Sequence, residues 1–422
     1  MGTGSSKADV NSTPVEKITD HEKSITCMAL SEDESLLVTG SDDGTARMWS
    51  SKTSSTECLG IFRGHTDYIT CITVYDTYVL TGGADATIRK WDMTTCECLD
   101  VYGGHDSRIF RLLCNGNWIF SSSYDRTCRA WRFDTSDLDD DEDPCIRVFR
   151  GHEKAVLPLV YIPGVELTGI GYSPDDINPS DLLLTGSADG TARSWSVETG
   201  GCLKIFKGHR GPISCMATDI DGEVLFTASM DKTVRSWDIA SGRCLKTFEG
   251  HENGIISMFV GKTMLYTGSA DGTAKSWVID FGECTRTYKG HQHSVTCVQV
   301  CGGILFTASG DMSVRAFDAK AGSLRKTYVG HEAGVMSLAY VGGYIFSGGS
   351  DGVLMKWDAQ GLVENETKPA LSSDKQAQKE KQNLRMAQLE AQLDDYVDLN
   401  RSFGSKALMR NLHNAKSGTA WA

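Results

Sequence analysis

Short stretches rich in β-branched and aromatic residues, separated by turn dipeptides, recur along most of the chain. The segment from Leu265 to Trp277 reads Leu-Tyr-Thr-Gly-Ser-Ala-Asp-Gly-Thr-Ala-Lys-Ser-Trp, with two such stretches around an Asp-Gly pair. This arrangement indicates two strands joined by a tight hairpin, because glycine accepts the positive φ that the turn requires. The pattern therefore predicts an all-β domain over residues 14–363.

A repeated set of four residues groups the expected strands. Each copy has a His, which follows Gly in every copy but the first, then a hydroxyl residue, an Asp and an aromatic residue. The Asp always lies six residues before the aromatic residue, and the hydroxyl residue lies four before the Asp. The eight copies are His21, Thr39, Asp43, Trp49; His65, Thr81, Asp85, Trp91; His105, Ser121, Asp125, Trp131; His152, Thr185, Asp189, Trp195; His209, Thr227, Asp231, Trp237; His251, Thr267, Asp271, Trp277; His291, Thr307, Asp311, Phe317; and His331, Ser347, Asp351, Trp357.

Each copy contains the strands of one four-stranded sheet, which cannot bury both of its faces alone. Over roughly residues 14 to 358 the sequence resembles the WD-repeat propeller family, and the resemblance implies an eight-bladed β-propeller. The segment Pro14 to His21 aligns with Cys244 to His251, the outer strand before a Gly-His pair. We therefore expect the N-terminal strand to complete the last blade and close the ring.

The repeated His, Ser or Thr, and Asp could suggest the triad of a hydrolase. In the family that these residues resemble, they form with the Trp one buried hydrogen-bond chain inside each blade. Eight copies of a catalytic site would be unusual, whereas eight copies of a structural brace are expected, so we predict that the protein is not an enzyme. The brace is represented by His65, Thr81, Asp85, Trp91, His251, Thr267, Asp271 and Trp277.

The chain has 14 cysteines, and most occupy equivalent positions in different repeats. Equivalent positions in neighbouring blades are about 10 Å apart, beyond the reach of a disulfide or a shared metal ion. We therefore expect these cysteines to be small core residues, with no metal site, no cofactor and no small-molecule substrate.

Charge and hydropathy limit the partners and the compartment. The net charge of -13, without a basic stripe, argues against nucleic acid. Neither a secretory leader at Met1 nor a long apolar run is apparent, which favours a cytoplasmic protein whose partners are other proteins.

The resemblance also indicates which residues contact partners. In WD-repeat propellers these lie one and three residues after the His and directly before the hairpin Asp, on the face that we call the top. Repeats two to five carry aromatic, Arg and Met side chains there, which are common interface anchors, and the alternative is that they are scattered surface residues. Arg111 also departs from the repeat, because other copies have Cys, Ser or Pro at its position. The candidate partner-binding residues are Tyr68, Arg108, Tyr124, Arg210 and Met230.

The opposite, bottom face should carry two insertions, an acidic stretch at 134–143 and a segment rich in Gly, Pro and Asp at 161–181. The acidic stretch lacks the glycine and the closing Glu of a calcium-binding loop. A solvated loop and a docking site for a basic partner both stay open.

Both tails carry local signals. Gly2 and Ser6 match the pattern for N-myristoylation, so residues 1–13 are either a lipid-bearing tail or an ordinary flexible start. Residues 364–422 are polar, with a helix expected near 373–400 from a capping-box spacing and an apolar stripe.

These features favour a non-catalytic scaffold for protein partners, for which a myristoyl group on Gly2 would provide a membrane tether. The alternative is a substrate receptor of a ubiquitin ligase, since the amino-acid sequence of the repeats is similar to that of F-box WD-repeat proteins. No F-box-length region precedes the repeats, which argues against this alternative.

Overall fold

The computed structural model describes residues 11–136, 138–139, 142–164 and 178–363. The chain divides into two units, Met1–Glu364 and Asn365–Ala422, and the described residues all belong to the first. Gly2 and the helix expected near 373–400 therefore lie outside the described residues.

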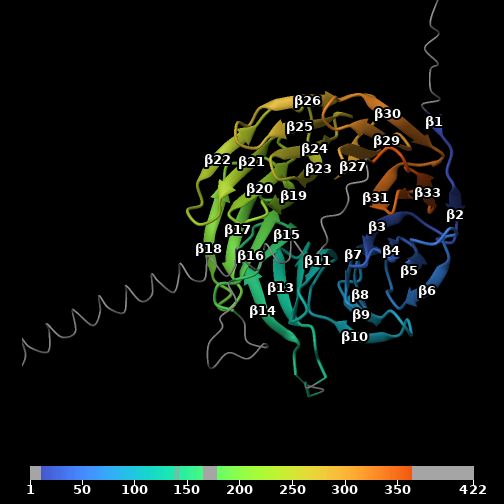
Figure 1. Cartoon of the computed structure of the whole chain (residues 1–422). Helices are drawn as coiled ribbons and strands as arrows, with labels where there is room; N and C mark the ends of the chain where they lie inside the picture. The colour runs from blue at the N-terminus through green and yellow to red at the C-terminus, as the bar shows by residue number, and fades with distance from the viewer. Residues whose placement is uncertain (1–10, 137, 140–141, 165–177, 364–422) are drawn as a thin grey trace, which may run out of the picture. The chain divides into compact units, whose positions relative to one another are not determined.

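The described residues form eight antiparallel sheets, the blades of a β-propeller (Figure 1). This confirms the predicted fold class. Within blades 1 to 7, each strand pairs with the next one along the chain, from the innermost strand to the outermost, whereas the outermost strand of blade 8 comes from the N-terminal segment. Blade 1 contains β3 (Ile25–Leu30), β4 (Leu36–Ser41), β5 (Thr45–Ser50) and β6 (Cys58–Arg63); blade 2, β7 (Ile69–Tyr75), β8 (Tyr78–Gly83), β9 (Ile88–Asp92) and β10 (Cys98–Tyr102); blade 3, β11 (Ile109–Cys114), β12 (Trp118–Ser123), β13 (Thr127–Arg132) and β14 (Cys145–Arg150); blade 4, β15 (Val156–Ile162), β16 (Leu182–Ser187), β17 (Thr191–Ser196) and β18 (Cys202–Lys207). Blade 5 contains β19 (Ile213–Thr218), β20 (Val224–Ser229), β21 (Val234–Asp238) and β22 (Cys244–Phe248); blade 6, β23 (Ile255–Val260), β24 (Met264–Ser269), β25 (Ala274–Val278) and β26 (Cys284–Tyr288); blade 7, β27 (Val295–Cys301), β28 (Ile304–Ser309), β29 (Ser313–Asp318) and β30 (Leu324–Val329); blade 8, β31 (Val335–Val341), β32 (Tyr344–Gly349), β33 (Leu354–Asp358) and β2 (Glu16–Ile18).

The hydrophobic core lies between neighbouring blades. Val38 and Phe62 of blade 1 are buried against Val79 and Trp91 of blade 2, and each of these side chains is at most 1% exposed. Each sheet thus buries both faces against its neighbours, and removal of apolar surface from water supplies most of the stability.

The ring is closed by the N-terminal strand, since β2 pairs antiparallel with β33 of blade 8. Lys356 of β33 is fully buried, and its Nζ donates to the carbonyl of Thr53 in blade 1 at 3.0 Å. Glu16 of β2 supplies a carboxylate 3.9 Å from this ammonium group. The short strand β1 (Asn11–Ser12) adds in parallel to β30 of blade 7, so the first described residues bind two blades.

The cysteines do not all lie in the core as expected. All 14 are free thiols, but Cys58, Cys202 and Cys284 are exposed. They begin the outermost strands of their blades, which have no further strand outside them. The repeat spacing identified equivalent positions correctly, but it did not distinguish an outer strand from a buried one.

No helix of sufficient length and hydrophobicity to cross a membrane occurs among the described residues.

Candidate functional site

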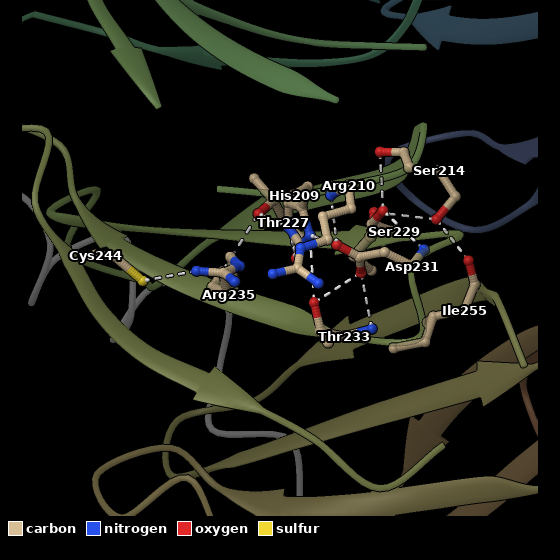
Figure 2. Close-up of polar contacts among 12 residues, drawn as sticks. His209, Arg210, Ser214, Thr227, Ser229, Asp231, Thr233, Arg235, Cys244 and Ile255 are labelled. Atoms are coloured by element: carbon tan, nitrogen blue, oxygen red, sulfur yellow. Dashed lines mark hydrogen bonds and ion pairs between the residues drawn. The ribbon is translucent and has the colours of Figure 1, made fainter. Parts of the chain in front are cut away.

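The repeated polar residues form a hydrogen-bond chain that Figure 2 shows in blade 5. His209, in the loop before β19, makes a 2.8 Å contact from Nδ1 to Asp231 Oδ2 and another of 2.8 Å from Nε2 to Thr227 Oγ1. Trp237 Nε1 donates to the same Thr227 Oγ1 at 2.8 Å. The chain thus joins the entering loop, β20, the hairpin Asp and β21 within one blade.

The direction of this chain follows from its donors. Indole nitrogen can only donate, so the Thr227 oxygen accepts from Trp237. In a neutral His209 the ring nitrogen that faces the Asp231 carboxylate carries the proton, so Nε2 accepts from the Thr227 hydroxyl. His209 Nδ1 then carries the proton that Asp231 accepts. Every polar atom along the chain is paired with the imidazole neutral.

The pKa values agree with this assignment. Burial lowers the pKa of His209 below its usual 6.5, which outweighs the attraction of the neighbouring Asp231. Burial raises the pKa of Asp231, but the backbone N–H of Arg210 and hydrogen bonds from Thr233 and His209 outweigh that effect and hold its pKa at about 2. Asp231 is therefore ionised at neutral pH and also fixes the hairpin.

The chain recurs in all eight blades, with His Nδ1 to Asp distances from 2.6 Å to 3.0 Å. Blade 7 alone lacks the indole donor, because Phe317 replaces the Trp. The chain hydroxyls are fully buried, as Thr81 and Thr267 illustrate at 0% exposure. A hydroxyl that is buried and already hydrogen-bonded on both sides is not available to a substrate.

A second cluster lies on the top face, at the junction of blades 2 and 3. Arg108, directly before β11, donates from Nη1 to the hydroxyl of Tyr68 at 3.1 Å. Its guanidinium also lies 4.6 Å from the ring centroid of Tyr124, which belongs to the hairpin between β12 and β13. Together with Asp67 and Asp106, these residues line an open pocket of about 650 Å³. Three of the five candidate rim residues thus come together.

Arg210 and Met230 lie apart from this cluster, on blade 5. The backbone N–H of Arg210 donates to Asp231, and its side chain is exposed. Met230 is 46% exposed, and its side chain lies against Gly254 of blade 6, where an added Cβ would come within 2.8 Å of the sulfur. These two residues form a separate rim surface.

Three aspartates line the pocket, and sequence reasoning missed Asp67 and Asp106, while it had assigned Asp85 to the brace. Asp106 directly follows a repeat His, which is one of the rim positions, so the spacing rule could have found it. Asp67 lies between two rim positions, and only the structure brings its side chain into the pocket.

The bottom-face insertions are described only in part. Thr135 Oγ1 donates to Asp100 Oδ1 at 2.6 Å, and the buried Lys90 lies 3.1 Å from the other oxygen of that carboxylate. The acidic stretch is thus attached to blade 2 at its first residues, while 137, 140–141 and 165–177 lie outside the described residues. Across the described ranges, His, Cys, Asp and Glu form no group of three that could hold a metal ion.

Relatives of the chain share its repeats. It is 42% identical to human WD repeat-containing protein 86 over 203 residues, which are 48% of this chain and 51% of that protein. It is 27% identical to Mitochondrial division protein 1 of Mycosarcoma maydis over 200 residues, 44% of this chain and 22% of that protein. The chain therefore spans about half or less of the length of these relatives.

Solved structures match the fold. The computationally designed protein Ika8 aligns with a TM-score of 0.69 and 26% identity, covering 82% of this chain and 98% of that one. Saccharomyces cerevisiae Sqt1 aligns with a TM-score of 0.70 and 15% identity over the same shares of the two chains.

The model of the family "WD domain, G-beta repeat" matches eight segments that cover most of the described residues, and each contains the outermost strand of one blade and the three inner strands of the next. The segments are 12–50, 56–92, 96–132, 143–196, 200–238, 242–277, 282–318 and 322–358. The protein belongs to the WD40 repeat family.

Proposed function

We propose that the protein is a non-catalytic scaffold that binds a protein partner on the top of blades 2 and 3, with blade 5 as a second contact. The observation that carries this proposal is the cluster of Tyr68, Arg108 and Tyr124 around an open pocket. Tyrosine and arginine are the residues most often found at the energetic centres of interfaces. Arg108 is held in place before binding, so less conformational entropy is lost on association.

The absence of catalysis is part of the proposal. In each described blade, the repeated His, hydroxyl residue and Asp, which could otherwise act as base, nucleophile and orienting group, are used by the brace. The alignments with the relatives cover less than half of this chain. The proposal is therefore argued from this chain's own surface.

Affinity capture followed by mass spectrometry tests the surface. The variant Arg108→Ala with Tyr124→Ala should lose the partners that the unchanged protein retains, because truncating central anchors costs a few kcal/mol of binding energy. The matched control is Ser294→Ala with Ser350→Ala, which alters the equivalent rim positions of blades 7 and 8.

Retention of every partner by the Arg108 and Tyr124 variant would refute the surface. Loss of a partner only when Arg210 and Met230 are replaced would move the interface to blade 5. Recovery of a cullin or its adaptor would favour the ubiquitin-ligase receptor over a plain scaffold.

A membrane tether is a separate part of the proposal and rests on Gly2, which lies outside the described residues. Metabolic labelling with a myristate analogue should mark the unchanged chain and the Gly4→Ala control but not Gly2→Ala. An unlabelled wild-type chain would exclude the acyl group.

A further inference from the structure

Blade 3 departs from the eightfold repeat at two neighbouring positions, and both departures are arginines. The position of Arg108, three residues after the repeat His, holds uncharged residues in the other blades: Ser24, Tyr68, Ala155, Pro212, Gly254, Ser294 and Gly334. The position of Arg111 is also uncharged elsewhere: Cys27, Cys71, Pro158, Cys215, Ser257, Cys297 and Ser337. The other seven blades fold without an arginine at either position, so the blade fold requires neither Arg108 nor Arg111.

Arg111 lies on β11, which adjoins the innermost strands β7 and β15 of the neighbouring blades (Figure 1). At this position in blade 1, the Cys27 thiol packs against Gly40, where an added Cβ would come within 2.8 Å of the sulfur. Blade 3 has Ser122 in place of that glycine, and the Ser122 hydroxyl donates to the carbonyl of Leu157 in blade 4 at 2.7 Å. The Arg111 side chain does not pack inside the blade as Cys27 does, and it is exposed.

The charge of Arg111 acts on thiols of several blades, as expected for an exposed side chain on an innermost strand. Burial raises the pKa of the Cys27 and Cys297 thiols to about 11 and that of Cys71 and Cys215 to about 12, and the charge of Arg111 opposes this shift in all four. These thiols belong to blades 1, 7, 2 and 5. A single charge reaches all four only from near the axis, where propellers of this kind enclose a central channel.

Neither arginine has an acidic partner. Across the described ranges, no carboxylate lies within 4.0 Å of Arg108 or Arg111, although Asp67 and Asp106 line the same pocket as Arg108. Arg108 uses one nitrogen for Tyr68, and the Arg111 guanidinium makes no hydrogen bond to the described residues. Both guanidiniums therefore retain donors in the fork geometry that matches a carboxylate.

We propose that Arg108 and Arg111 together bind an extended acidic peptide of the partner, with one acidic side chain at the rim and a second at the axis. The proposal rests on the proposed function, because it names the chemistry that the scaffold's top surface recognises. Three residues of extended chain span about 10 Å, so two acidic residues three positions apart would match the two arginines.

The pocket carboxylates refine this preference. Asp67, Asp85 and Asp106 repel further negative charge at the rim, so a basic or neutral residue is favoured beside the outer acidic one. The net charge of -13 gives acidic segments no long-range attraction, and the recognition is local.

The test is selection of eight-residue peptides from a random library displayed on phage, using the full chain as bait. Arg111→Ser and Arg108→Ser introduce the residue that other blades carry at these positions, so both variants should fold. The matched control is Arg132→Ser, an exposed arginine at the bottom end of β13 in the same blade. Circular dichroism checks each fold.

The unchanged chain and the control should enrich Asp or Glu at two positions three apart. Each test variant should lose one of the two preferences and bind the selected peptide about tenfold more weakly by fluorescence polarisation.

An Arg111→Ser variant with the wild-type preference would overturn the inference, as would peptides that depend on Tyr124 but contain no acidic pair. Peptides whose selection is unchanged in Tyr124→Ala, or a wild-type chain that selects none, would instead overturn the proposed function. A synthetic peptide with phosphoserine in place of the acidic residues distinguishes the two sources of negative charge.

Discussion

Blades 3 and 6 have the same interior and different top surfaces. In blade 3 the His105 contacts are 2.6 Å to Asp125 and 2.8 Å to Ser121, and in blade 6 the equivalent His251 contacts are 2.7 Å and 2.8 Å. At the rim, blade 3 carries an arginine on a tyrosine ring, whereas blade 6 carries glycine and alanine. The brace is therefore a property of the fold, and the rim varies without changing it. Function in such a repeat protein is found by comparing its blades with one another.

The largest effect should follow from opening the ring. Deletion of residues 1–20 removes the pairing of β2 with β33 and the Glu16 carboxylate beside the buried Lys356. We expect a loss of about 4 kcal/mol, from several backbone hydrogen bonds of about 1 kcal/mol each and an uncovered strand edge. Urea denaturation measures it, and deletion of residues 364–422 is the comparison. Equal losses in the two deletion variants would contradict the prediction that closure by β2 stabilises the ring.

Within the blades, the cost of breaking a brace should depend on its length. Thr267→Val in blade 6 leaves both His251 Nε2 and Trp277 Nε1 unpaired, so we expect a loss of about 3 kcal/mol. Thr307→Val in blade 7 strands only the imidazole of His291, because Phe317 has no donor, and about half that loss is expected. Thermal unfolding of the two variants compares them, and equal losses would mean that the indole bond contributes nothing.

Acid should weaken the braces. Burial lowers the pKa of His21, His209, His251 and His331 below 6.5, so the unfolded chain binds more protons than the folded one as the pH falls through 6.5. The free energy of unfolding should therefore fall as the pH falls below about 6.5. A second decline is expected below pH 3.8, because hydrogen bonds hold the pKa of the brace aspartates near 2 in blades 1, 5 and 6.

Urea unfolding at a series of pH values from 7.5 to 4.5, repeated in 0.5 M salt, measures this effect. A decline caused by burial persists in salt, whereas one caused by repulsion among surface charges is screened. A free energy of unfolding that stays constant across this range would contradict the neutral assignment of the imidazoles.

The smallest effect on stability is expected at the rim. Arg108→Ala with Tyr124→Ala removes one partly buried hydrogen bond and one cation–π contact, and should change the free energy of unfolding by about 1 kcal/mol. Denaturation beside the partner-capture experiment checks that binding, and not folding, is lost. A larger loss of unfolding free energy would mean that the cluster also stabilises the fold.

The interior could be predicted because its signal is repeated. Eight copies of the same spacing identify His251, Thr267, Asp271 and Trp277 as one blade unit, and hydrogen-bond chemistry then fixes their partners. Tyr68, Arg108 and Tyr124 could be nominated from their positions in the repeat. That Arg108 reaches Tyr68 of the preceding blade depends on side-chain rotamers across a blade junction, which sequence spacing does not encode.

Contacts that do not follow the eightfold repeat could not be predicted from its spacing. Lys90 and Lys356 occupy the position before the Trp, where other blades have small or apolar residues, and each is buried. Their ammonium groups donate to carbonyls of the next blade, Phe133 and Thr53. A lysine in a strand is usually solvated, so only the packing of neighbouring blades reveals the bridge.

Closure by β2 also sets the order of events when the chain is made. Strand β2, which completes blade 8, leaves the ribosome before all the strands of blades 1 to 7, and its partner β33 follows more than 300 residues later. At ordinary rates of synthesis this is a wait of roughly 20 s to a minute, during which blades 1 to 7 can assemble behind it. Until then Lys356 lacks the Glu16 carboxylate and the last blade keeps an unpaired edge. The nascent propeller is thus an open arc whose final step joins an early strand to a late one, and that interval is when it most depends on protection from other chains.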